Sequence, residues 1–253
     1  MASSPTEPHF FQSFDGARLA WREIGAGRPV VLIHGLFSDG FTNWIRYGHA
    51  EAIAARGFRV IMPDLRAHGF SAKPHDAASY PADVLERDGQ ALVEHLGLTD
   101  YDLGGYSLGA RTTVRMLANG AAPRRVILSG MGLDGLIGTT RRADHFRHIL
   151  TNLGQHERGS PEWLAEAFLK TTKGDPVALL HILDTFVDTN EAQIAAIRQP
   201  VLVLCGVEDN DNGSAEALAA VLPEATYRTV PGGHMSAVLK PELGREIADF
   251  LAA

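Results

Sequence analysis

Ser107 stands between two glycines near the middle of the chain, in the spacing G-x-S-x-G with Gly105 and Gly109. A short apolar segment, 101–104, precedes it, and a helix-forming segment, 111–118, follows it. We therefore predict a strand that turns at once into a helix, with the serine at the pivot in a positive-φ conformation. Such a turn exposes the hydroxyl at a helix N-terminus, where free N–H groups and the helix dipole favour a developing negative charge.

A serine between glycines is also typical of a plain turn, and the hydroxyl is a weak nucleophile that needs a base. The apolar segment 201–205 predicts a strand buried on both faces, and Asp209 follows its end. A second strand is predicted over 226–230, and His234 follows it after a glycine-containing loop. An imidazole can take the serine proton while a carboxylate holds its other nitrogen. The order Ser107, Asp209, His234 therefore predicts nucleophilic attack on a carbonyl group.

Together these motifs resemble those of the α/β-hydrolase fold, in the branch of small single-domain esterases. The segment 30–37 resembles the family's strand and His-Gly loop. The segment 62–71 resembles its next strand and turn, with Ala67 where many relatives have glycine. The resemblance runs from about Phe11 to the C-terminus and is weakest over 133–199. It implies an α/β fold: a mainly parallel twisted sheet with helices on both faces and a helical cap inserted after the sixth strand.

The resemblance also implies a role for each candidate residue. Ser107 would be the nucleophile, His234 the base and Asp209 the acid. The backbone N–H groups of Leu36 and Leu108 would bind the oxyanion. Asp209 keeps the family's G-x-x-D spacing, but the sequence leaves other carboxylates as alternatives, namely Glu208, Asp211 and Asp134.

The remaining patterns predict the elements that position these residues. Strands are expected over residues 10–14, 18–24, 58–62 and 125–129, and a further strand is expected to begin at Val30. Helices are expected over residues 40–56 and 81–96. Because strands alternate with helices, the strands should be mainly parallel, with the candidate residues on loops at their C-terminal ends.

We predict a core domain of residues 1–132 and 200–253, with residues 133–199 as a helical cap insertion. Helical pieces are expected at 141–153, 161–171, 176–187 and 191–197. Pro161 and Pro176 suit first-turn positions, with Ser160 and Asp175 as N-caps. Bulky cap residues are expected to line a small substrate pocket that favours short acyl chains: Phe146, Trp163, Phe168 and Phe186.

Composition limits the classes of partner. The chain has 23 basic and 30 acidic residues in 253, a net charge of −7, which argues against nucleic acid or an anionic membrane as partner. The single cysteine, Cys205, lies in an apolar strand, which predicts a buried structural thiol. The first eight residues have no basic start and no apolar core, so we expect no secretory signal and a cytoplasmic protein.

We expect no metal and no cofactor. His145 and His148 lie three residues apart beside Asp144 on a predicted cap helix, but with no third ligand in the pattern they suit a solvated face. The glycines at 104, 105 and 109 belong to the predicted turn, and no phosphate-binding loop of the G-x-x-x-x-G-K-[ST] kind is present.

The resemblance favours a carboxylesterase that acts on small, uncharged, apolar esters or lactones with water. Relatives with the same triad carry out perhydrolysis, acyl transfer, C–C bond hydrolysis or hydroxynitrile cleavage, and the triad does not separate these activities. Relatives that dehalogenate alkanes or open epoxides have an aspartate in place of the serine, so Ser107 argues against both. A non-catalytic ligand-binding member of the fold is the alternative of a different class. The sequence leaves the oligomeric state open.

Overall fold

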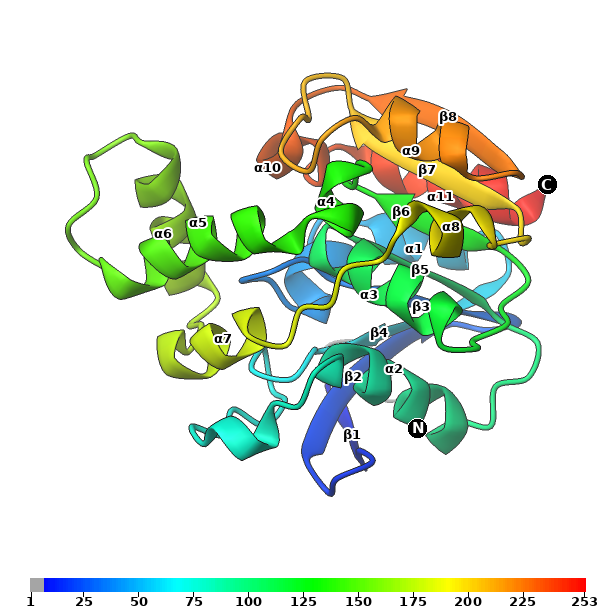
Figure 1. Cartoon of the computed structure of the whole chain (residues 1–253). Helices are drawn as coiled ribbons and strands as arrows, with labels where there is room; N and C mark the ends of the chain where they lie inside the picture. The colour runs from blue at the N-terminus through cyan, green and yellow to red at the C-terminus, as the bar shows by residue number, and fades with distance from the viewer. Residues whose placement is uncertain (1–6) are drawn as a thin grey trace.

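The computed structural model describes residues 7–253, which are built around an eight-stranded sheet in the order β1-β2-β4-β3-β5-β6-β7-β8 (Figure 1). The strands are β1 His9–Gln12, β2 Arg18–Gly25, β3 Arg28–Ile33, β4 Phe58–Pro63, β5 Asp102–Tyr106, β6 Val126–Ser129, β7 Val201–Gly206 and β8 Ala225–Val230. The pairs β1–β2 and β2–β4 are antiparallel, and the five other pairs are parallel. The predicted mainly parallel α/β sheet is confirmed.

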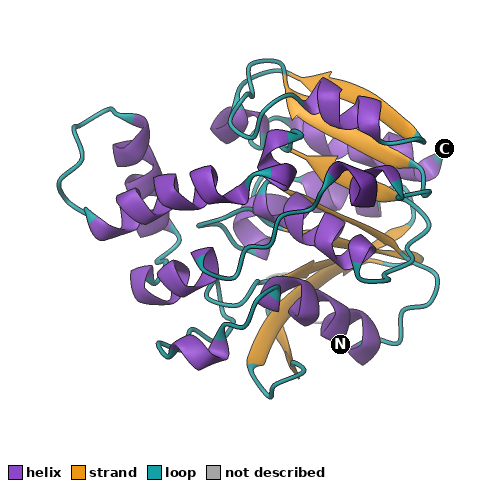
Figure 2. Cartoon of the chain, viewed as in Figure 1, coloured by secondary structure: helices purple, strands orange, loops and turns teal. Residues whose placement is uncertain are grey.

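Helices cover both faces of the sheet (Figure 2). They are α1 His49–Ala54, α2 Val84–His95, α3 Leu108–Ala118, α9 Ala215–Val221, α10 His234–Ala237 and α11 Pro241–Ala252. Successive residues of a strand point to opposite faces, so each face of β3 packs on a different helical layer. Val30 and Leu32 pack in the cluster that contains α1 and α11, whereas Val31 and Ile33 pack in the cluster that contains α2.

The prediction of one continuous helix over residues 40–56 is wrong. The chain forms a helical turn at Phe41–Ile45 and then α1, and between them Gly48 has φ +79. A left-handed residue cannot continue a right-handed helix, so the break lies at this glycine. A second short helical turn, Ala77–Ser79, precedes α2.

The segment between β6 and β7 forms α4 Asp134–Ile137, α5 Thr139–Thr151, α6 Pro161–Thr171, α7 Pro176–Leu183 and α8 Glu191–Ala195. The predicted N-caps are confirmed, because the Ser160 hydroxyl accepts from the N–H of Trp163, and the Asp175 carboxylate accepts from two N–H groups of α7. In Figure 1, α5, α6 and α7 project to the left of the sheet. The last helix, α8, instead packs through Ile194 on Ala110 and Val114 of α3, in the core.

Cys205 is buried in β7, as predicted, and burial raises the pKa of its thiol to about 12. The N-terminal segment on which the expectation of no secretory signal rests lies mostly outside the described residues. Within residues 7–253, no helix is both long and apolar enough to cross a membrane.

Candidate active site

The strand–turn–helix predicted around Ser107 is confirmed. Ser107 follows β5 with φ +54 and ψ −111, and α3 starts at the next residue. A Cβ on Gly109 would lie 2.1 Å from the carbonyl oxygen of Ile33, and one on Gly105 would lie 2.4 Å from the carbonyl carbon of Gly109. Both contacts are shorter than real Cβ atoms allow, so the turn requires glycine at these two positions. The strained backbone holds the serine hydroxyl at the C-terminal edge of the sheet.

The structure brings Ser107, His234 and Asp209 together from three separate loops. His234 Nε2 lies 3.0 Å from Ser107 Oγ, and His234 Nδ1 lies 2.9 Å from Asp209 Oδ2. The carboxylate accepts a hydrogen bond from Nδ1–H, which leaves Nε2 free to accept the serine proton. The arrangement can therefore carry a proton from the hydroxyl to the imidazole, and the carboxylate stabilises the resulting cation.

The other candidate acids do not reach His234. Asp211 Oδ2 lies 3.0 Å from Arg142 in an exposed ion pair, and its N–H donates to Asp209 Oδ1 at 3.2 Å. Glu208 is exposed, and Asp134 begins α4 beside the backbone of Gly213.

Tyr106 supports the histidine. The sequence does not predict this contact, because nothing in it distinguishes Tyr106 from other buried strand residues. Its hydroxyl donates to the carbonyl oxygen of His234 at 2.6 Å, and the two rings lie 5.4 Å apart. Burial, with Asp209 nearby, raises the pKa of the phenol well above its ordinary value, so it remains a neutral donor. The bond fixes the backbone of the loop that carries the imidazole.

The loop after β3 lies against the serine. A Cβ on Gly35 would lie 3.5 Å from the Ser107 Cβ. Gly35 is fixed by its N–H, which donates to Asn43 Oδ1 at 3.1 Å, and by its carbonyl, which accepts from His34 Nδ1–H at 2.7 Å. His34 Nε2 accepts from the N–H of Leu65 at 3.0 Å, which sets the tautomer. Burial lowers the pKa of His34, so its ring is neutral and structural.

The backbone N–H groups predicted for the oxyanion are those of Leu36 and Leu108, one on each side of this contact. In the part of the chain from residue 7 onward, no protein oxygen accepts a hydrogen bond from either group. Two unpaired N–H groups next to a serine hydroxyl are able to bind a negatively charged oxygen.

A cleft of about 260 Å³ opens at the serine. It is lined by Leu36, Ser107, Leu108, Arg111, Met131, Arg142, Phe146, Phe186 and Asn212. Of the predicted pocket residues, Phe146 and Phe186 are in this lining. Trp163 and Phe168 are not, because they lie on α6, which packs on α5.

The sequence reasoning missed Arg111 and Arg142 in this lining. A signal for Arg111 was present: it is a charged residue four positions after Ser107, on a helix that follows a central strand and must be buried on most sides. No group of three or more His, Cys, Asp or Glu side chains in the described residues is arranged to hold a metal ion.

Comparison with known proteins agrees with this geometry. The family model described as alpha/beta hydrolase fold matches residues 28–134. A non-heme haloperoxidase from Rhodococcus erythropolis is 35% identical over 120 residues, which are 46% of this chain and 40% of that protein. The match thus spans less than half of that relative.

Solved structures match over nearly the whole chain. A hydrolase from Pseudomonas aeruginosa PA01 has a TM-score of 0.79 at 24% identity, covering 99% of this chain and 100% of the other. A thermophilic esterase from Thermogutta terrifontis has a TM-score of 0.72 at 25% identity, covering 97% of this chain and 98% of the other. These structures share the order and packing of the elements described above.

Proposed function

The chain belongs to the α/β-hydrolase fold superfamily, and from that premise we propose that it is a serine hydrolase that cleaves a small ester or lactone through an acyl-enzyme on Ser107. The observation that carries the proposal is the hydrogen-bonded series Ser107 Oγ, His234 Nε2, His234 Nδ1 and Asp209 Oδ2, with distances of 3.0 and 2.9 Å. The similarity to a thermophilic esterase at 25% identity favours ester bonds among the substrates of the superfamily.

In the proposed reaction, Ser107 Oγ attacks the carbonyl carbon while its proton passes to His234 Nε2. The carbonyl oxygen becomes an oxyanion, which accepts hydrogen bonds from the N–H groups of Leu36 and Leu108. When the tetrahedral intermediate collapses, the leaving alcohol takes the proton from the imidazolium. A water then attacks the acyl-enzyme and gives its proton to His234. When this second intermediate collapses, the bond to Ser107 Oγ breaks, Ser107 Oγ takes the proton back from the imidazolium, and the carboxylic acid is released.

We also propose that α5, α6 and α7, residues 139–183, form the cap over this reaction. Phe146 on α5 supports this, because its ring packs 5.4 Å from the ring of Phe37, which follows the loop of Leu36. The Thr172 hydroxyl after α6 donates to the carbonyl of Phe37 at 2.6 Å. The cap thus contacts the loop that would bind the oxyanion, and the small cleft favours short acyl groups.

Turnover of p-nitrophenyl acetate and butyrate tests the proposal. The wild-type protein should release p-nitrophenol, and Ser107→Ala should lose this activity because it removes the hydroxyl that lies 3.0 Å from His234 Nε2. Ser214→Ala is the matched control, since Ser214 caps α9 away from the cleft and should leave turnover unchanged. Absence of turnover in the wild type, or equal turnover in Ser107→Ala, would contradict the proposal. In the first case the same protein would be tested for perhydrolysis, acyl transfer and C–C bond hydrolysis.

A further inference from the structure

Arg111 is a buried arginine at the cleft. It lies one turn after Ser107 on α3, where its N–H donates to the Ser107 carbonyl at 3.0 Å. Only 5% of the residue is exposed. Nε and Nη1 are buried, and in the described residues neither has a hydrogen-bond partner. Buried guanidinium N–H groups without acceptors are costly, because their hydrogen bonds to water are lost and not replaced.

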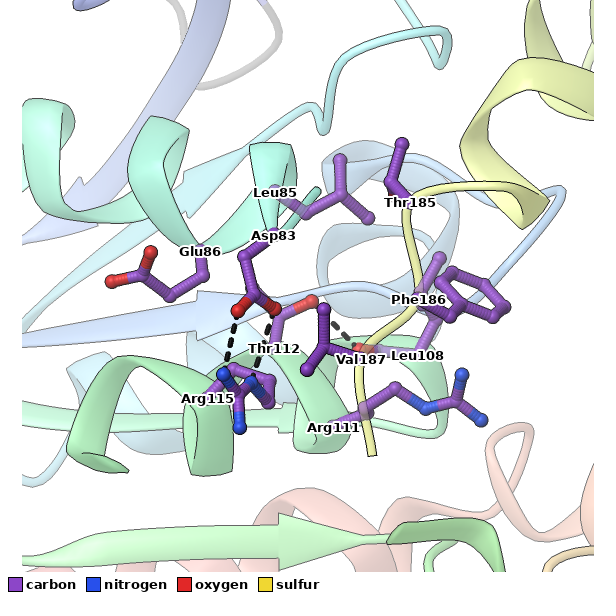
Figure 3. Close-up of a pocket in the computed structure, with 10 residues that line it drawn as sticks. All are labelled: Asp83, Leu85, Glu86, Leu108, Arg111, Thr112, Arg115, Thr185, Phe186 and Val187. Carbon is purple, nitrogen blue, oxygen red and sulfur yellow. Dashed lines mark hydrogen bonds and ion pairs between the residues drawn. The ribbon is translucent and has the colours of Figure 1, made fainter. Parts of the chain in front are cut away.

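The guanidinium faces two joined hollows. Arg111 lines the cleft that contains Ser107 and also an adjoining cleft of about 270 Å³, and the two share Leu108, Arg111 and Phe186. Figure 3 shows the adjoining cleft, in which no dashed line reaches Arg111. A ligand bound over Ser107 therefore extends naturally to this side chain, since four residues of helix advance only about 6 Å.

Arg115 lies one turn further along α3 and, unlike Arg111, has a carboxylate partner. Its Nε and Nη2 donate to the two oxygens of Asp83 at 3.0 and 2.6 Å, as drawn in Figure 3. Asp188 is the carboxylate whose negative charge favours the charged form of Arg111. Its side chain, however, accepts a hydrogen bond from the N–H of Thr139 at 2.8 Å. Asp188 therefore acts on the charge of Arg111 only from a distance, and no carboxylate within the described residues forms an ion pair with Arg111.

The rest of the lining supports an anion. Arg142, on α5, also lines the cleft. Its guanidinium forms an exposed ion pair with Asp211. Phe186 lies under Arg111, with the guanidinium carbon 4.3 Å from the ring centroid, so the aromatic face orients the cation. Burial and the charge of Arg142 lower the pKa of Arg111 to about 10, which leaves it charged at neutral pH.

We propose that Arg111, assisted by Arg142, binds a carboxylate on the substrate, so that the ester or lactone cleaved at Ser107 is an anion. A single unpaired guanidinium in a small cleft matches one carboxylate in charge and in the geometry of its donors. The inference rests on the proposed function and replaces one part of what the sequence predicted, an uncharged and apolar substrate.

The test compares two esters that differ by one negative charge and one methyl group: 4-nitrophenyl hydrogen adipate and its neutral methyl ester, methyl 4-nitrophenyl adipate. The wild type should favour the charged ester in kcat/KM by about ten- to hundred-fold. Arg111→Met keeps an unbranched apolar stem but removes the guanidinium and its charge, and the preference of this variant should fall to about one-fold. Arg111→Lys should recover part of the preference. Arg124→Met removes an exposed arginine outside the cleft and should keep the full wild-type preference.

Binding of adipate to Ser107→Ala, measured by calorimetry, separates this inference from the proposed reaction. Adipate should bind Ser107→Ala and not Ser107→Ala/Arg111→Met. If the wild type cleaves both esters equally, or if Arg111→Met keeps the preference, the carboxylate site is overturned while the hydrolase proposal stands. If neither ester is cleaved but adipate binds in an Arg111-dependent way, the carboxylate site stands and the proposed reaction fails.

Discussion

Arg66 and Arg111 are both buried arginines, and the structure treats them in opposite ways. Arg66 is fully buried after β4 and donates five hydrogen bonds, to Asp15, Asp88 and the carbonyl of Ser79, at 2.6 to 2.9 Å. It thereby joins the β1–β2 turn to the start of α2. Arg111 is buried to nearly the same extent beside Ser107 and has no such partners within the described residues. The difference indicates that a buried charge paired within the chain stabilises the fold, whereas a buried charge without an ion-pair partner at a cleft is available to bind a ligand.

The comparison assumes that the cleft beside Arg111 is a catalytic site. Asp209→Asn tests this assumption and should have the largest effect on activity. The substitution removes the charge that orients His234, and kcat for p-nitrophenyl butyrate should fall by about 10⁴-fold while the fold is kept. Asp211→Asn changes the neighbouring carboxylate, which pairs with Arg142 on the surface, and should leave kcat for this neutral ester within about two-fold. A damaging Asp211→Asn beside a mild Asp209→Asn would mean that the acid has been misassigned.

Substitution of the two arginines by methionine tests the comparison directly. Arg66→Met leaves two carboxylates without their cation, one of them, Asp88, buried, and the free energy of unfolding should fall by about 3–5 kcal/mol. Arg111→Met removes a buried charge that has no ion-pair partner within residues 7–253, so the free energy of unfolding should be unchanged or rise by about 1 kcal/mol. Urea unfolding of both variants at neutral pH provides the measurement. An equal loss in Arg111→Met would break the comparison, because Arg111 would then be needed for the fold.

The aromatic side chains of α5 and α6 provide a smaller contrast, between one that lines the cleft and one that does not. Phe146→Ala removes a ring from the lining and should shift the preference towards longer acyl chains, by about 1–3 kcal/mol in relative kcat/KM. Trp163→Ala, on the outer helix α6, should leave the profile as in wild type. A p-nitrophenyl series from acetate to octanoate measures both. If Trp163→Ala shifts the profile as much as Phe146→Ala, the cap residues act on the cleft in another conformation.

Buried histidines extend the contrast, because they avoid the cost of burial by staying neutral. The rings of His34 and His68 lie 5.0 Å apart, and burial lowers the pKa of both, that of His68 more strongly. Their contribution to stability is therefore present above the ordinary imidazole pKa of about 6.5 and is lost as the pH falls below it, since only the unfolded chain takes up protons.

The expected slope for each buried histidine is about 1.4 kcal/mol per pH unit at most. Between pH 6.5 and 5, His68→Gln should lower the slope of the free energy of unfolding against pH by the contribution of one histidine. This change in slope is independent of the effect of the substitution on stability at pH 7.5. Urea unfolding at four pH values for wild type and variant gives the two slopes. Identical slopes would show that His68 does not stay neutral in the folded chain.

The parts of the site that follow from local backbone rules could be predicted from the sequence. Gly105 and Gly109 flank Ser107 in a spacing typical of a strand–helix turn, and the structure has that turn. The strand before Asp209 is a continuous apolar run, and the strand before His234 is rich in β-branched and aromatic residues, so both are predicted as strands. Parallel packing then brings their ends to the same edge as Ser107. Ser160 and Asp175 as N-caps also depend only on neighbouring residues.

The rest depends on contacts between distant segments, which no local pattern encodes. Nothing near Arg111 in the sequence shows that it lacks a partner, since its neighbour Arg115 finds Asp83 more than thirty residues away. Trp163 and Phe168 are as bulky as Phe146, but only the packing of α6 on α5 decides which rings reach the cleft. The same holds for α8, which the sequence placed in the predicted cap insertion of residues 133–199, whereas its Ile194 lies in a buried cluster of the core.

Covalent labelling by a fluorophosphonate tests the central claim, that Ser107 is an activated nucleophile. The reagent forms a bond to a serine only where a base accepts the proton and N–H groups bind the resulting oxyanion. Intact-mass and peptide mass spectrometry should find one adduct per chain, on the peptide that carries Ser107. Ser107→Ala should remain unlabelled. An unlabelled wild type, or an adduct of equal yield in Ser107→Ala, would contradict the account.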